Sequence, residues 1–110
     1  MEQLQIINIL KDIGFKPSLI GFKYLVRAIQ EYNSCDGKLK QIYYNIARQY
    51  SVTSSSVEGS IRRCIEACFN RSTPNDTWYT IFSNVFGDDK PNNKLVIICI
   101  AQYINNKEVI

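Results

Sequence analysis

The sequence contains no histidine, and its four cysteines, Cys35, Cys64, Cys68 and Cys99, include no Cys-x-x-Cys pair. Common zinc sites are built from such pairs and from histidine, so we expect no metal and no cofactor. Without histidine, general acid–base chemistry would depend on carboxylates or cysteines, and these form no convincing cluster along the chain. The chain is therefore expected not to be an enzyme.

Long apolar runs are also missing. The longest is Leu95–Ala101, seven residues, whereas a membrane span needs about 18. Met1 is followed by a polar amphipathic segment rather than by a signal peptide. We expect a cytoplasmic, nucleoid-associated protein with reduced cysteines and no membrane partner.

Residues that break secondary structure are few, with five glycines and three prolines in 110 residues. Between them, apolar residues recur at three- and four-residue spacing, which is typical of amphipathic helices. Residues 95–101 have the composition of a buried strand, but the sequence offers no second strand to pair with them. We predict one domain over residues 1–110, all-α, a compact bundle of about five to six helices. The expected ranges are 3–13, about 18–33, a separate short helix at 38–43, a helix pair within 42–69, about 76–86 ending at Gly87, and 93–105.

The helix pair in residues 42–69 has the pattern of a helix-turn-helix. Its two apolar stripes are separated by Ser51, Val52 and Thr53, a segment too short for anything but a sharp turn. Val52 is expected to point inward, and Ser51 stands where many such turns have glycine. The second helix should begin between Thr53 and Ser55, where Ser55 and Glu58 fit a capping box.

The exposed face of this second helix carries the chemistry expected at a nucleic-acid interface. At 100° per residue, Gly59, Arg62 and Arg63 lie opposite the apolar stripe, which includes Cys64 and Cys68. Arginine can bind guanine edges and phosphates with two hydrogen bonds, as a recognition helix requires. An ordinary amphipathic helix with a solvated basic face remains the simpler reading of this helix taken alone.

Positive charge is concentrated in the same segment. Residues 38–71 carry six cations and two carboxylates, a net charge of +4, whereas residues 1–37 are neutral and residues 72–110 have a net charge of −1. We expect Lys40, Arg48, Arg62 and Arg63 to lie on one surface beside the second helix, where a phosphate-binding surface needs them.

The last helix is apolar around most of its girth. Such a helix is either buried or has one face in its own domain and another in a partner. Both interpretations stay open, burial in the core and a homodimer contact through Leu95–Tyr103.

The stretches IGFKPSLIGFKYLVRAI, IYYNIARQYSVTSSSVEGSIRRCIEACF and KPNNKLVIICIA resemble the C-terminal DNA-binding (effector) domain of the stage-zero sporulation protein A family of response regulators. The resemblance covers nearly the whole chain. It implies an all-helical domain that binds double-stranded DNA, often as tandem head-to-tail copies, with RNA polymerase as a further candidate partner. It also implies base and phosphate contacts at six positions of this chain, Ser55, Ser56, Glu58, Gly59, Arg62 and Arg63.

Two of these positions depart from the family. Gly59 and Ser56 stand where family members commonly have arginine, and no phosphoryl-receiver domain is recognisable, so an excised domain and a stand-alone relative both remain open. The preferred hypothesis is a sequence-specific DNA-binding transcription regulator whose helix at about 54–70 enters the major groove. The alternative is a protein-interaction module on a degenerate helix-turn-helix that no longer reads the family's DNA box.

Overall fold

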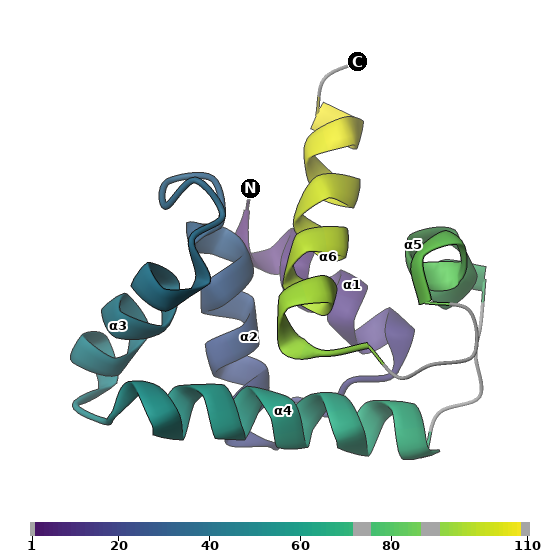
Figure 1. The fold of residues 1–110 in the computed structure, drawn as a ribbon. Helices are drawn as coiled ribbons and strands as arrows, with labels where there is room; N and C mark the ends of the chain where they lie inside the picture. The colour runs from purple at the N-terminus through teal and green to yellow at the C-terminus, as the bar shows by residue number, and fades with distance from the viewer. Residues whose placement is uncertain (1, 72–75, 87–90, 109–110) are drawn as a thin grey trace.

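The computed structural model describes residues 2–71, 76–86 and 91–108, with the side chains of Arg71, residues 83–86 and Glu108 left aside. Every regular element in these ranges is an α-helix, which confirms the all-α fold (Figure 1). The helices are α1 (Gln3–Ile13), α2 (Ile20–Glu31), α3 (Leu39–Tyr50), α4 (Ser54–Arg71), α5 (Asp76–Phe86) and α6 (Asn93–Glu108).

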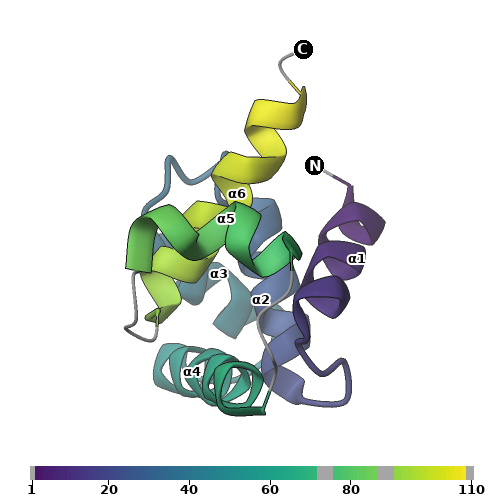
Figure 2. The same ribbon diagram turned by 90° about the vertical axis from the view of Figure 1, so that its right-hand side faces the viewer.

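Helix α2 is the centre of the bundle and packs against α1, α3, α4 and α6. Its residues Leu25 and Ile29 are fully buried, as are Ile46 of α3, Ile61 of α4 and Ile100 of α6. Helix α4 lies across one end of this bundle, so that one side faces the core and the other faces outward (Figures 1 and 2). The fold therefore presents α4 along its full length at one edge of the molecule.

The first helix has the predicted range, residues 3–13, and Gly14 ends it. Gly14 adopts the left-handed conformation with φ 119° and donates its N–H to Leu10 and Lys11. The N–H of Phe15 donates to the carbonyl of Leu10 at 2.9 Å, and the Phe15 ring is buried. This is the hydrogen-bonding pattern of a glycine-terminated helix, which turns the chain sharply toward α2.

Helix α3 is one continuous helix, so the prediction of a separate short helix at 38–43 was wrong. No glycine or proline interrupts residues 39–50, and hydrogen bonding continues through them. The helix ends at Ser51, which occupies the left-handed region with φ 56° and ψ 44°. A non-glycine residue there costs about 1–2 kcal/mol, a strain that the packing of α3 against α4 must offset.

Two details of the turn differ from the sequence prediction. Val52 was expected to point inward, but 36% of it is exposed, because the turn lies at the edge of the molecule where α4 begins. Thr53 caps α4, since its Oγ1 accepts the Ser56 N–H at 3.0 Å. Ser55 lies inside the helix and so does not form the predicted capping box with Glu58.

Helix α5 is attached to the end of α4 by aromatic contacts. The ring of Phe69 packs edge-on against Trp78 and Phe82 of α5, with centroids 5.8 Å apart in each case, and against Phe15. The predicted end of this helix at Gly87 lies outside the described residues. Helix α6 confirms the predicted helix at 93–105 and extends to Glu108.

Within the described part of the chain, no helix combines the length and apolar character that a membrane crossing needs.

Candidate nucleic-acid interface

The outward side of α4 is the candidate site, and the predicted residues of this helix lie on it. Ser55, Ser56, Arg62 and Arg63 are exposed, and Glu58 is partly exposed. The opposite side is packed into the core by residues that recur at helical spacing. These buried residues are Val57, Ser60, Ile61, Cys64, Ile65 and Cys68.

Gly59 lies at the middle of this outward side, but it was wrongly expected to be open to solvent. Gly59 is buried, because the side chains of Arg62 and Arg63 fold back over it. A Cβ atom at Gly59 would lie 3.3 Å from an Arg63 Nη and 3.6 Å from an Arg62 Nη. The absence of a side chain at Gly59 thus leaves a small space that two guanidinium groups cover.

Each of these arginines is held by a neighbour on its own helix. Arg62 Nη1 donates to Glu58 Oε1 at 2.8 Å, one helical turn earlier, with both side chains about half exposed. Arg63 Nη2 donates to the hydroxyl of the buried Ser60 at 3.3 Å. Exposed ion pairs of this kind add less than about 1 kcal/mol to stability, so their main effect here is to orient the guanidinium groups.

A close helix crossing fixes where α4 sits. Gly21 of α2 meets α4 at Ser60, and a Cβ atom at Gly21 would lie 2.0 Å from the Ser60 carbonyl oxygen and 2.8 Å from the Cβ of Cys64. Only glycine allows this approach, because any side chain at position 21 would collide with the backbone of α4. Ser60 is therefore fixed at its backbone by α2, while its side chain reaches Arg63.

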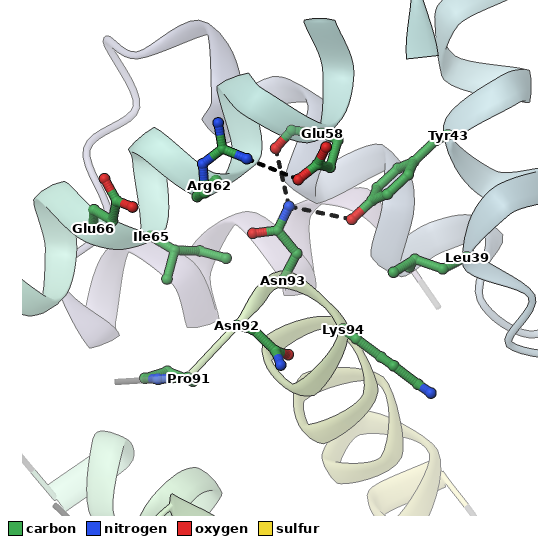
Figure 3. A pocket seen from close by; sticks show the side chains of 10 residues that line it. All are labelled: Leu39, Tyr43, Glu58, Arg62, Ile65, Glu66, Pro91, Asn92, Asn93 and Lys94. Carbon is green, nitrogen blue, oxygen red and sulfur yellow. Dashed lines mark hydrogen bonds and ion pairs between the residues drawn. The ribbon is translucent and has the colours of Figure 1, made fainter. Parts of the chain in front are cut away.

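A pocket of about 410 Å³ opens beside the outward side of α4, between α3 and the start of α6 (Figure 3). At its base the amide of Asn93 donates to the Glu58 carbonyl at 3.0 Å and to the Tyr43 hydroxyl at 3.2 Å. Burial raises the pKa of Tyr43, the hydrogen bond from Asn93 lowers it, and the charge of Glu58 raises it again. Arg62 and Lys94 also line the pocket.

Sequence reasoning missed Asn93, Tyr43 and Ser60 as residues that support the site. For Asn93 a signal was present, since a polar residue opens an otherwise apolar helix. Its partners on α3 and α4 lie 50 and 35 residues away, and nothing in the local pattern indicates them.

The remaining two predicted cations have other neighbours. Arg48 stacks over the ring of Tyr44 and borders a hollow with Arg27 and Glu31 of α2. Lys40 borders a different hollow with Lys38 and Tyr44. Arg62 and Arg63 are thus brought together over Gly59, while the contact of Lys40 and Arg48 with DNA stays a prediction.

The cysteines on α4 are part of the core. Cys64 and Cys68 are 1% and 2% exposed, and neither they nor Cys35 and Cys99 form a disulfide. Burial, with a smaller contribution from Cys68, raises the pKa of Cys64 to about 11. Among the residues that the structure describes, no three metal-binding side chains gather into a cluster.

Comparison with known families agrees with this architecture. The family described as "Sporulation initiation factor Spo0A C terminal" matches residues 6–104, which is nearly the entire chain. The chain belongs to this family. Its members are the DNA-binding effector domains of sporulation response regulators, and such a domain is a binding module rather than a catalytic one. The match begins inside α1 and ends inside α6, so it includes α3 and α4, the two helices joined by the short turn at residues 51–53 that was expected from the sequence.

Proposed function

We propose that this chain is a sequence-specific DNA-binding transcription regulator that inserts α4 into the major groove. The observation that carries the proposal is the outward side of α4, where Ser55, Ser56, Arg62 and Arg63 are exposed along a helix at the edge of the bundle. In helix-turn-helix proteins the second helix reads base edges from such a face. Phosphate contacts would come from the cations beside it.

The test is a titration of fluorescent DNA duplexes of random sequence at two salt concentrations. We expect binding that weakens as salt rises, because each neutralised phosphate releases counterions. Replacing Lys40, Arg48, Arg62 or Arg63 with alanine should flatten the salt slope by about one unit for each residue that contacts phosphate. Lys107→Ala is the control, since Lys107 stacks on Tyr103 at the far end of α6 from α4. Unchanged binding by a variant in which all four of these residues are replaced with alanine would reject the proposal.

A second candidate function is a protein-interaction module. Gly59 removes a side chain from the reading face, and α6 leaves Leu95, Ile98, Cys99 and Tyr103 only half-buried. In that case the titration would show no DNA binding at either salt concentration, and the two functions are therefore separable by one measurement.

The proposed partners follow from the same surfaces. A homodimer on tandem DNA sites would use the half-buried stripe of α6 within Leu95–Tyr103, together with the exposed Gln102. Val96, Ile97, Ile100 and Ala101 of this segment are buried in the protein's own core. RNA polymerase is a second proposed partner for a regulator bound beside a promoter.

A further inference from the structure

We infer that Arg62 and Arg63 form a two-arginine reading site over Gly59, selective for adjacent guanines, with Ser60 and Glu58 as its positioning residues. This inference rests on the proposed DNA-binding function and specifies which bases that function reads. It assigns the base contacts to the two guanidinium groups above Gly59, rather than to a side chain at position 59.

The geometry shows two cations directed at one point. Nitrogen atoms of both guanidinium groups lie within 4 Å of the position that a Gly59 Cβ would occupy. Like charges repel at short range, and Glu58 balances only one of them through its 2.8 Å contact with Arg62. The hydroxyl of Ser60 orients Arg63 without adding negative charge. The arrangement is therefore completed by a ligand rich in hydrogen-bond acceptors.

The place of the gap on α4 favours bases over phosphates as that ligand. Gly59 lies opposite the buried residues Val57, Ile61 and Cys64, so it points outward along the line on which the helix would enter a groove. Phosphates flank the groove, whereas base edges form its floor. In the major groove guanine presents two acceptors, O6 and N7, which match one guanidinium fork. Two forks side by side match two neighbouring guanines.

Each arginine uses one N–H donor for its contact on α4, and its other N–H donors remain available for a base. A guanidinium group has five N–H donors, and the Glu58 and Ser60 contacts each use one. The remaining donors can form a bidentate contact while the holding contact stays in place. Ser60 is well placed for this role because its backbone packs against Gly21 and the residue is only 5% exposed.

The experiment selects duplexes from a randomised library with the intact chain at fixed salt. Competition binding then compares the selected duplex with versions in which single guanines are changed to adenine. We expect a pair of adjacent guanines whose individual replacement weakens binding about 5- to 100-fold, the range for one bidentate arginine–guanine contact.

Four variants locate the reading groups. Arg62→Lys and Arg63→Lys keep the charge but lose the fork, so each should lose preference at one guanine and keep affinity for scrambled DNA. Ser60→Ala should reduce preference at the guanine that Arg63→Lys affects, with unchanged thermal stability. Gly59→Leu should fill the gap and lose preference at both guanines, while gaining stability from its higher helix propensity. Lys107→Ala should leave the whole profile unchanged.

The outcomes separate this inference from the proposed function. Loss of affinity that is equal for all sequences, with a flatter salt slope, would assign both arginines to phosphates and overturn the two-arginine site. Selected duplexes without adjacent guanines, or a Ser60→Ala profile identical to that of the unaltered chain, would also overturn it. Failure of the unaltered chain to retain any duplex would instead overturn the proposed function, and the inference with it.

Discussion

At the scale of single residues, two glycines on crossing helices have opposite surroundings. Gly21 faces backbone, since its missing Cβ would lie 2.0 Å from the Ser60 carbonyl oxygen. Gly59 faces only the ends of two flexible arginine side chains. Both are helical glycines, so the same substitution at the two positions should have opposite effects on stability.

Gly21→Ala should destabilise the domain by about 1–3 kcal/mol or more, because α2 and α4 must move apart. Gly59→Ala is the matched control and should gain up to about 1 kcal/mol from helix propensity. Urea unfolding followed by circular dichroism measures both changes. A Gly21→Ala variant as stable as the unaltered chain would show that the two helices do not approach as closely as described.

The family relationship gives a second prediction at Gly59. Gly59→Arg restores the side chain that family members commonly have, and only the mobile ends of Arg62 and Arg63 have to move. We expect the variant to bind the family's DNA box about 1–3 kcal/mol more tightly, the contribution of one bidentate arginine–guanine contact. Binding isotherms on box and scrambled duplexes test it. A strong preference for the box without the substitution, and no gain with it, would contradict the prediction.

The buried thiol of Cys64 predicts a pH dependence of stability. Its pKa in the folded protein is raised from 9.0 to about 11. The unfolded chain therefore loses this proton at lower pH than the folded protein does, and the free energy of unfolding falls as pH rises through this window. The loss should be roughly 1–3 kcal/mol. Urea unfolding at several pH values compares the chain with Cys64→Ala, whose slope should be shallower. Parallel slopes would rule out Cys64 as the cause.

At the scale of elements, α4 is held from two directions. Helix α2 fixes it through the Gly21 crossing, and the start of α6 fixes it through Asn93 (Figure 3). Asn93 is 9% exposed and joins the Glu58 carbonyl to the Tyr43 hydroxyl, so one side chain connects α3, α4 and α6. Helix α6 thus supports α4 as well as filling the core.

Asn93→Ala should destabilise the domain by about 1–3 kcal/mol, because it leaves the part-buried Tyr43 hydroxyl and Glu58 carbonyl with one partner fewer. Asn105→Ala on the same helix is the matched control, since its hydrogen bonds to Asn33 are exposed. The control should change stability by less than about 0.5 kcal/mol. Thermal unfolding of both variants gives the comparison, and equal losses would argue against a special role for Asn93.

At the scale of the whole molecule, the outward side of α4 and the half-buried stripe of α6 are separate surfaces. If the stripe joins two copies on tandem DNA sites, Ile98→Glu should abolish cooperative binding and leave affinity for a single site unchanged. A half-buried position tolerates a charge in the monomer better than a core position does. Titration of duplexes with one and two sites measures this. Cooperativity that survives the substitution would place the contact elsewhere.

Helix periodicity was enough to predict most of the fold and the register of α4. Apolar spacing and Gly14 determined α1, and the same spacing placed Gly59, Arg62 and Arg63 on the side of α4 away from the core. These features depend on neighbours within a few residues, which the sequence displays directly. The unbroken α3 could have been inferred in the same way, because residues 39–50 contain no helix breaker.

Contacts between distant residues were decided only by the tertiary structure. Gly59 is covered because two long side chains fold over it, and Val52 is exposed because α4 starts at the edge of the bundle. Asn93 supports α4 from 35 residues away. Each outcome depends on which helices meet and where their side chains turn, and helical spacing carries no information about either. The sequence by itself therefore determined which side of α4 faces outward, and the packing of α2, α3 and α6 determined how the residues on that side are held.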